Sequence, residues 1–554
     1  MRATKMNKAI SKTRMLPVVV MALGLLFTAS AHAAAPGITG PTFNLTAQPA
    51  YLTQPDGQAI YSWGYGCNGA PSGFAPKPGG ADLPNAACNA MQVPGPTLIV
   101  TENIPFTVTL TNGLPTAAGN TSILFPGLQL VSTDGGAAGL LTQEATAASP
   151  VTYHLIATSP GTRAYYSGTQ GDLQVEMGLY GAIIVLPSNS AVLSGCASAQ
   201  AGNRAAQLQW GESDFRLAAA AYDNAQSCYD REYLFQFSEM DPRIHTQTLA
   251  QVRAAGNCTA GAAGCSLNVA TEPYHPSYFM INGRSMPDDM DPNYAFQYPH
   301  QPYNGNPHMH PGELTLIRVI GQGRWQHPFH EHGNHVRILA RDGNLIVSQT
   351  AATDTTQTPL AGPLLFTTTT TPGLAFDGIF YWTGKGLNWD PFGHNPKSTD
   401  SNAKLTCTPD ANGYNTGAPT AINYYEWCQD HNKPMQAAPF GDIAAGGPVT
   451  LPDPNLFTNG AWYGGSPYLG PNATLRATGC SSNSYINANQ TSCGQTGSTP
   501  PSGTIANSPS GEAGFAFMWH SHNEREITTN NVFPGGMLMM MLVDSREFVI
   551  DESM

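Results

Sequence analysis

The amino-acid sequence predicts an all-β protein built from antiparallel sandwiches, and three observations predict this class. Short runs rich in β-forming residues recur along the chain, and Gly, Pro, Asn or Asp bounds them. Gly and Pro are abundant, with 58 and 45 residues among 554. Long amphipathic helical patterns are scarce, and only 11% of the residues are charged. Short strands separated by turn residues are typical of β-sandwiches.

The predicted strands follow one another through the chain. They are TLIVTENIPFTVTLTN (97–112), AIIVLP (182–187), YLFQFSEM (233–240), YFMING (278–283), ELTLIRVIG (313–321), HVRILARDG (335–343), DGIFYWTG (377–384) and FAFMWHSH (515–522). Residues 200–220 predict a connector with some helix. Five consecutive threonines at 367–371 favour a further strand, because Thr has a high β-propensity. Residues 395–510 are rich in Gly, Pro, Asn, Ser and Thr, and they predict long ordered loops.

The first 33 residues predict a secretory signal peptide. Five basic residues and no acid precede the apolar run MLPVVVMALGLLFTA, and the cleavage-type triplet Ala31-His32-Ala33 follows it. A retained membrane anchor is the alternative, but the run is shorter than the roughly 20 residues that a spanning helix needs. No later segment is apolar enough to span a bilayer. We therefore expect an exported protein, periplasmic or extracellular, without a membrane span.

The charge balance narrows the choice of partners. Cleavage after Ala33 would change the formal net charge from −13 to −18, because five basic residues and no acidic residue are lost. An acidic chain repels nucleic acid and anionic lipid. The charge therefore excludes nucleic acid as a partner and suits metal cations or a basic protein.

Ten cysteines follow the predicted signal peptide, and export would place them in an oxidising compartment. Sequence alone leaves their connectivity open. Pairing of neighbours along the chain is the simplest arrangement, and it gives Cys67–Cys88, Cys196–Cys228, Cys258–Cys265, Cys407–Cys428 and Cys480–Cys493. We expect these bonds to brace loops.

Three stretches together resemble the multicopper oxidases, the family of laccases and related blue oxidases. The first is VPGPTLIVTENIPFTVTLTNGLP at 93–115, continued by GLYGAIIVLP at 178–187. The second is HPFHEHG at 327–333, and the third is FMWHSHNEREITTNNVFPGGMLMMMLV at 517–543. The resemblance implies tandem cupredoxin-like domains with Greek-key topology.

The resemblance also implies a domain organisation. Residues 40–190 would form a first cupredoxin-like domain and residues 205–395 a second one that carries HPFHEHG. Residues 396–554 would be either a loop-rich insertion or a small third domain that ends in WHSH. The 188 positions between His332 and His520 leave both arrangements open.

The family holds three copper ions with four His-x-His pairs, and this chain has two of them. Leu124 and Pro126 stand where the first pair is expected, and Tyr166 and Gly168 stand where the second is expected. The third and fourth pairs remain as His330 with His332 and His520 with His522. The resemblance therefore implies a reduced site.

The separate blue copper site of the family is also altered. His327 remains, but Ser521 replaces the expected cysteine and Glu526 replaces the second histidine. Met537 follows a Gly, as the family's axial methionine does. A serine hydroxyl cannot replace the copper-binding thiolate. We therefore predict that the protein lacks a blue copper.

The remaining histidines predict a metal site for one or two ions, with copper first and zinc, manganese or iron as alternatives. Residues two apart on a strand share a face, so each His-x-His pair offers two imidazoles together. If the last strand runs on, Glu524 and Glu526 share the face of His520 and His522. The alternative is a vestigial site whose neutral imidazoles are hydrogen-bonded inside a sandwich.

Two further motifs remain open. PHMHPGE supplies His308 and His310, either as a second metal cluster or as a polar loop. The run Met539–Met541 favours strand core over a soft-metal site.

Two functions follow from these features. The first is an exported copper-binding protein, active in metal handling or in a restricted oxidoreductase reaction. The second is a non-enzymatic scaffold or surface-assembly protein with a vestigial metal site, for which a protein partner or self-assembly is expected.

Overall fold

The computed structural model describes residues 35–75, 88–348, 355–385, 405–429, 465–467, 514–546 and 550. The predicted signal peptide, most of residues 395–510, and the pair Cys480 and Cys493 lie outside these residues.

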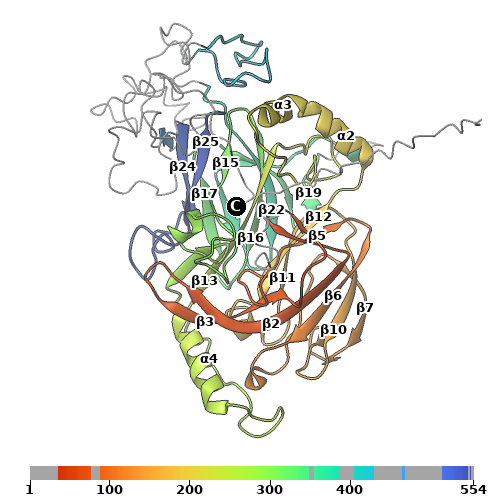
Figure 1. Ribbon diagram of the computed structural model, residues 1–554, viewed down its shortest axis with the longest axis vertical. Helices are drawn as coiled ribbons and strands as arrows, with labels where there is room; N and C mark the ends of the chain where they lie inside the picture. Colours follow the sequence, from red (N-terminus) through yellow and green to blue (C-terminus); the bar gives the residue numbers. More distant parts are fainter. Residues whose placement is uncertain are drawn as a thin grey trace, which may run out of the picture. The chain divides into compact units, whose positions relative to one another are not determined.

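Two five-stranded sheets form the first sandwich (Figure 1). Their strand orders are β11-β12-β5-β1-β4 and β3-β2-β6-β10-β7. The strands are β1 (Gly37–Thr39), β2 (Thr42–Thr53), β3 (Ala59–Cys67), β4 (Phe74–Ala75), β5 (Leu98–Thr101), β6 (Pro105–Asn112), β7 (Gln129–Gly135), β10 (Val151–Ile156), β11 (Gly161–Tyr166) and β12 (Tyr180–Leu186). Strands β8 (Ala137–Ala138) and β9 (Gln143–Glu144) pair separately. Leu45, Val108 and Ile183 belong to one buried cluster, so side chains of both sheets share one core.

A seven-stranded and a six-stranded sheet form the second sandwich. The first has the order β14-β13-β16-β22-β18-β19, with β20 beside β18. The second has the order β15-β25-β24-β17-β21, with β23 beside β24. The strands are β13 (Arg231–Met240), β14 (Tyr278–Ile281), β15 (His308–Met309), β16 (Leu314–Gly321), β17 (His327–Glu331), β18 (Val336–Arg341), β19 (Asn344–Leu345), β20 (Leu364–Leu365), β21 (Thr367–Thr370), β22 (Ala375–Tyr381), β23 (Gly465–Pro467), β24 (Gly514–Ser521) and β25 (Leu538–Asp544).

The core of the second sandwich is aromatic and Met-rich. Phe235 and Phe329 lie on different sheets, and their rings meet edge to face at 6.3 Å. Met539 and Met541 are fully buried in the same cluster, whereas Met540 is only partly buried. The prediction of strand core for this methionine run is confirmed at the two alternating positions.

Strand β17 lies between β24 and β21 in its sheet, and Figure 1 shows β17 beside β24. β17 and β24 are antiparallel, with His330 opposite His520. The strands after residue 513 therefore belong to the sheet that contains β17. The predicted domain boundaries stay a prediction.

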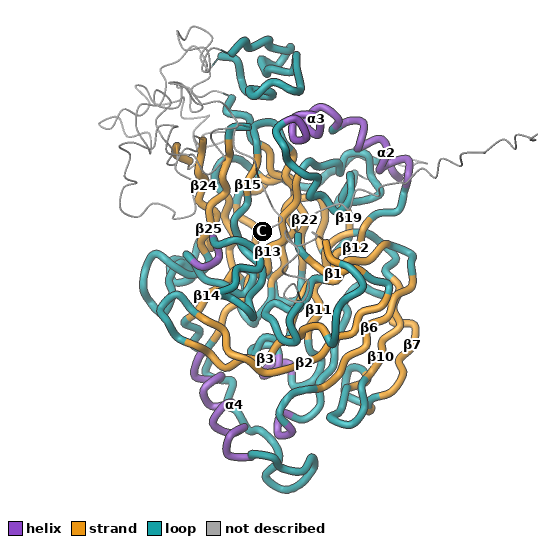
Figure 2. The backbone as a smooth tube through the Cα atoms, viewed as in Figure 1, coloured by secondary structure: helices purple, strands orange, loops and turns teal. Residues whose placement is uncertain are grey.

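Helices are few, and Figure 2 shows them outside the two sandwiches. They are α1 (Gly171–Gln174), α2 (Ser190–Ala199), α3 (Ala201–Gln209), α4 (Pro242–Ala255) and the 3-10 turns η1 (Thr116–Ala118), η2 (Asp288–Met290) and η3 (Thr355–Gln357). α3 falls within the connector predicted at 200–220, but α2 and α4 were not predicted. Their start signals are present in the sequence. Asn189 caps α2, and Asp241 caps α4 just before Pro242.

The predicted fold class is confirmed, since strands make up most of the regular structure and pack as sandwiches. The predicted strand in the threonine run is also confirmed, as β21.

Four disulfides join neighbouring cysteines in the described residues. They are Cys67–Cys88, Cys196–Cys228, Cys258–Cys265 and Cys407–Cys428. In the same part of the chain, no helix has the length and apolar composition needed to cross a membrane.

Candidate metal centre

Four histidines gather where β17 and β24 end, and we call His330, His332, His520 and His522 the histidine cluster. The ring centroid of His330 lies 4.8 Å from that of His332, 5.5 Å from that of His520 and 4.9 Å from that of His522. The two His-x-His pairs, which are far apart in the sequence, therefore form one site.

Strand pairing creates this arrangement. His330 lies opposite His520 in the antiparallel ladder. Two backbone hydrogen bonds continue the pairing beyond the strands, from His332 N to Met518 O at 3.2 Å and from His522 N to Pro328 O at 2.8 Å. Because side chains alternate between the faces of a sheet, these imidazoles share one face and Phe329 faces the core.

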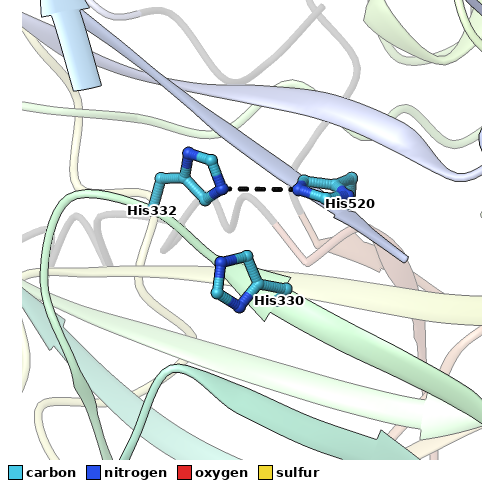
Figure 3. Close-up of side chains that lie close together, drawn as sticks. All are labelled: His330, His332 and His520. Carbon is cyan, nitrogen blue, oxygen red and sulfur yellow. Dashed lines mark hydrogen bonds between the residues drawn. The ribbon is translucent and has the colours of Figure 1, made fainter. Parts of the chain in front are cut away.

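Three of the imidazoles are close enough to share one ion. One ring nitrogen each of His330, His332 and His520 lies within 4.8 Å of the other two. Nε2 of His332 and Nε2 of His520 are 3.4 Å apart, and the dashed line in Figure 3 joins these two rings. In a tetrahedral site with metal–nitrogen bonds of about 2.0–2.1 Å, neighbouring nitrogens are about 3.3 Å apart. The spacing of these two nitrogens therefore fits a common metal ligand set.

The other ring nitrogens of two histidines are held by neighbours. Nδ1 of His330 is hydrogen-bonded to the Thr367 hydroxyl at 2.6 Å. Nδ1 of His520 is hydrogen-bonded to the Ser521 carbonyl at 2.7 Å. Contacts of this kind fix the orientation of a ligating imidazole and leave Nε2 as its ligand atom.

Burial keeps two rings of the cluster, those of His330 and His520, neutral. Burial, followed by repulsion from His332, His520 and His522, lowers the pKa of His330 to about 3. Burial is also the largest cause that lowers the pKa of His520, to about 4. Neutral imidazole is the form that binds metal. The cluster is therefore ready to coordinate a cation near neutral pH.

Neither glutamate continues the strand face of the histidines, although the charge of Glu524 is near enough to His520 to act on its pKa. The prediction that Glu524 and Glu526 continue the face of His520 and His522 is wrong, because β24 ends at Ser521 and a turn follows. Glu524 is exposed on that turn, and Glu526 is buried on the opposite side of the sheet.

Glu526 instead belongs to a second buried group, which we call the His327 clamp: His327, Glu526, Glu239 and Ser521. Nδ1 of His327 is 2.9 Å from Glu526, and Nε2 of His327 is 2.9 Å from Glu239. The Ser521 hydroxyl donates a hydrogen bond to the same oxygen of Glu526. All four residues are nearly or fully inaccessible to solvent.

The two carboxylates hold a proton on His327. Burial alone would lower the pKa of His327, but the hydrogen bonds to Glu239 and Glu526 outweigh it and raise the pKa to about 9. The imidazolium places one positive charge between two carboxylates. His327 therefore has no free ring nitrogen for copper, and Ser521 and Glu526 are engaged with each other.

Met537, the predicted axial ligand, is fully buried in the core of the second sandwich. Its backbone N–H donates to the carbonyl of Glu526 at 2.8 Å, and its own carbonyl accepts from the N–H of Ser521 at 2.9 Å. The backbone of Met537 thus fixes the turn that aims Glu526 at His327.

The positions of the two missing pairs lie together in the first sandwich. Leu124 and Tyr166 form a β-bridge through reciprocal backbone hydrogen bonds of 2.8 and 3.3 Å. Neither side chain is a nitrogen ligand. A cluster with all four His-x-His pairs is therefore absent from these described positions.

His308 and His310 are buried rather than part of a polar loop, so the polar-loop interpretation is wrong. Nδ1 of His308 lies 2.6 Å from Asp544. Nε2 of His310 lies 2.6 Å from Glu212, and Glu313 completes a group with the spacing of a metal site. His308 and His310 are buried because β15 pairs with β25, one of the last strands of the chain.

Arginines already neutralise that second group. Arg231 forms ion pairs with both Glu212 and Glu313, and Arg546 lies 3.6 Å from Glu313. A metal ion would have to displace a buried guanidinium from two carboxylates. We therefore interpret this group as a structural ion-pair network.

Three residues that shape these sites could not be predicted from the sequence. Glu239 lies near the end of β13, and a polar residue near the end of a strand such as YLFQFSEM is common and does not indicate a site. Thr367 was predicted only as strand. Glu212 lies in the connector between α3 and β13. Their roles depend on long-range contacts, and a single sequence contains no signal for them.

Comparison with known proteins gives a family match to one part of the chain and several solved structures of low identity. A family model described as multicopper oxidase matches residues 81–190. The search of curated proteins found no match. Among solved structures, a multicopper oxidase named mgLAC is 14% identical, with 92% of this chain and 87% of that chain covered and a TM-score of 0.42. A blue copper oxidase from Nitrosomonas europaea is 13% identical, with 90% of this chain and 85% of that chain covered and a TM-score of 0.41.

A copper nitrite reductase from the same organism is 16% identical, with 62% of this chain and 84% of that chain covered and a TM-score of 0.36. At such scores these likenesses carry no argument about function. The match at 81–190 covers the stretch that carried the predicted resemblance, at 93–115 and 178–187. Residues 81–190 of this chain therefore match the multicopper oxidase family, as the resemblance at 93–115 and 178–187 predicted.

Proposed function

We propose that this protein is exported and binds one transition-metal ion, with copper preferred, at the histidine cluster. It would act in metal handling or in a restricted oxidoreductase reaction, without a blue copper. The observation that carries the proposal is the group of three imidazoles whose nitrogens lie within 4.8 Å of one another.

The donor set fits copper. Imidazole suits copper and zinc, and the cluster contains no thiolate or carboxylate that would favour another class of ion. His330, His332 and His520 would be the ligands, and His522 is placed to join them. Bound copper would supply a one-electron redox centre or a Lewis acid.

The residues around the cluster support a bound cation. The Thr367 hydroxyl and the Ser521 carbonyl orient His330 and His520. Burial keeps both rings neutral. A metal ion therefore does not have to displace a proton from either ring. His522 is exposed, so the cluster is accessible from solvent on that side.

Export rests on the sequence of residues 1–33 and agrees with the four disulfides of the described chain. A four-copper oxidase is not proposed, because non-ligand side chains replace two of the four histidine pairs and the His327 clamp replaces the blue site.

One observation favours the second candidate, a non-enzymatic scaffold. The His327 clamp occupies the position through which the family's electrons would enter, and it contains no redox group. A protein with this clamp keeps a β-sandwich stabilised by buried ion pairs and lacks that entry point for electrons. The fate of the histidine cluster distinguishes the two candidates.

Metal content tests the proposal. The mature chain, residues 34–554, is stripped with a chelator and dialysed against copper, zinc and manganese at equal concentration, and bound metal is measured by elemental analysis. We expect about one copper per chain, with a paramagnetic resonance signal typical of nitrogen ligands and no intense blue colour. The double variant His330→Ala with His520→Ala should bind none.

A matched control removes a neighbouring histidine. His335 lies beside the same Phe366 ring as His330, at 4.9 and 5.7 Å between centroids, but outside the cluster. His335→Ala should bind copper as the wild type does. If the wild type and the double variant bind equal amounts, the metal proposal is wrong and the scaffold interpretation stands.

A further inference from the structure

A cavity of about 310 Å³ lies between the first sandwich and loops of the second. Its walls include Leu124, Tyr166 and Gly168 from the first sandwich and Gln322, Arg324 and Gly373 from the second. Ligand sites occur preferentially at such interfaces, and this volume lies at the lower end of their usual range. Three of these residues, Leu124, Tyr166 and Gly168, stand where the resemblance places histidine ligands.

Most of the wall is flat or apolar. Gly168, Gly171 and Gly373 have no side chain, and Leu124 and Val175 add aliphatic surface. At Gly171 an added Cβ would meet nothing within 4 Å, so the space beside it is open. The side chains of Leu124 and Tyr166 already cover the backbone at Gly168 and Gly373, so of these three glycines it is Gly171 that lets a flat ring approach the backbone closely. The shape therefore favours a single planar ring.

Polar groups on the wall favour an anion. Arg324 is the one charged side chain among the described residues that line the cavity. Its guanidinium is held 4.3 Å over the Tyr274 ring, and it donates to the carbonyl of Thr271 at 2.9 Å and to Glu272 at 2.6 Å. A guanidinium has five N–H donors, so donors remain for a further acceptor.

Tyr166 adds a second donor. Its hydroxyl makes no hydrogen bond within the described part of the chain, although Tyr166 is partly buried and lines the cavity. The carboxamide of Gln322 is turned elsewhere, because its nitrogen donates to Gly181 O and to Gln236, at 3.0 Å each. A carboxylate could accept from Tyr166 and Arg324 together.

We propose that this cavity binds a small monocyclic carboxylic acid. The ring would lie against Leu124, Val175 and Gly171, and the carboxylate would lie toward Arg324 and Tyr166. This site is independent of the metal proposed for the histidine cluster.

Calorimetric titration of the metal-free mature chain with benzoate tests the proposal. Benzamide, which has the same ring and no charge, and acetate, which has the charge and no ring, are titrated in parallel. We expect saturable binding of benzoate, binding of benzamide weaker by at least about tenfold, and no measurable binding of acetate.

Three variants locate the binding site. Gly171→Leu fills the cavity and should abolish benzoate binding. Gly195→Leu is its matched control, because an added Cβ at Gly195 on α2 also meets nothing within 4 Å. Arg324→Gln should weaken benzoate about tenfold and leave benzamide unchanged. The double variant His330→Ala with His520→Ala should bind benzoate as the wild type does.

The proposal is overturned if benzoate does not saturate, or if Gly171→Leu and Gly195→Leu bind it equally. An equal loss of benzamide and benzoate in Arg324→Gln overturns the assignment of the carboxylate. Loss of binding in the double histidine variant would show that benzoate binds at the histidine cluster instead. Urea unfolding of each variant confirms that it is folded, so that a lost signal reports lost binding.

Discussion

The two faces of the β17–β24 pair differ in the charge of their histidines. On one face, His330, His332 and His520 lie close together, and burial lowers the pKa values of His330 and His520. On the other face, His327 is protonated between Glu239 and Glu526. The first face offers imidazole nitrogens to a cation, whereas on the second face the protonated His327 is itself the cation. The same two strands therefore separate a candidate binding site from a structural ion pair.

Removal of His327 is expected to have the largest effect. His327→Leu leaves Glu239 and Glu526 buried without a counter-charge, which costs about 3–5 kcal/mol of unfolding free energy. His330→Leu in metal-free protein should cost about 1 kcal/mol or less, because a neutral side chain is replaced by an apolar one. Urea unfolding at pH 7 measures both. Equal losses of unfolding free energy in the two variants would show that the two faces do not differ in this way.

A compensated variant sharpens the same comparison. Addition of Glu239→Gln and Glu526→Gln to His327→Leu removes the uncompensated charges. Much of the lost free energy of unfolding should return, because unpaired buried charge causes most of the loss. A triple variant as unstable as His327→Leu would point to lost packing as the cause.

The pH dependence of stability is the next largest effect. The pKa of His327 is about 9 in the folded protein and about 6.5 in an unfolded chain. The clamp therefore contributes fully below pH 6.5, and its contribution is lost as pH rises through 9. The difference between the two pKa values corresponds to about 3 kcal/mol.

Unfolding free energies measured between pH 6 and 10 check this prediction. Glu526→Gln removes one carboxylate of the clamp, so the fall in stability at high pH should be smaller than in the wild type. Parallel pH profiles for the two proteins would contradict the assignment of the proton to His327.

Glu331 should give a gain in stability. Both its carboxyl oxygens are buried without a hydrogen-bond partner among the described residues, and burial raises the pKa of Glu331 well above its usual value. Glu331→Leu should add about 1–3 kcal/mol at pH 7. The gain should shrink below pH 4.5, because the carboxyl group of the unfolded chain is then also protonated. Urea unfolding at pH 7 and pH 4 measures the difference, and a loss of stability at pH 7 would refute the prediction.

Thr367 should give the smallest effect, confined to the metal site. Thr367→Val removes the hydroxyl that holds Nδ1 of His330 at 2.6 Å. Copper affinity of the mature chain should fall about tenfold in a competition assay with a chelator. Thr369→Val is the control, since Thr369 is exposed on the same strand and lies opposite Pro328. Equal copper affinities of the two variants would exclude an orienting role for Thr367.

Several features of both faces could be predicted from the sequence. The alternation of HPFHEHG and WHSH placed each histidine pair on one side of a strand, because the period of a strand is two residues. The replacement of a cysteine by Ser521 excluded a thiolate ligand without any structure. Strand content and neighbouring cysteine pairs were also predicted, and the described residues agree with both.

The paths of turns could not be predicted. Glu526 was expected beside His520, and it lies on the other face because β24 ends at Ser521 and the chain turns toward His327. The helix α4 was missed although Asp241-Pro242 is a good start signal and Ile244, Leu249 and Val252 form an apolar face. The burial of His308 depends on the parallel pairing of β15 with β25, whose residues lie more than 230 positions away.

The sequence by itself determined that the chain forms β-sandwiches, that two histidine pairs remain and that the blue copper ligands are incomplete. These conclusions depend on residue type and local period, which a sequence contains in full. Only the tertiary structure decided that the two pairs face one another and that Glu239 meets His327 across 88 positions. Contacts of that kind arise from strand pairing and sandwich packing. They depend on distances in space, which sequence separation does not specify.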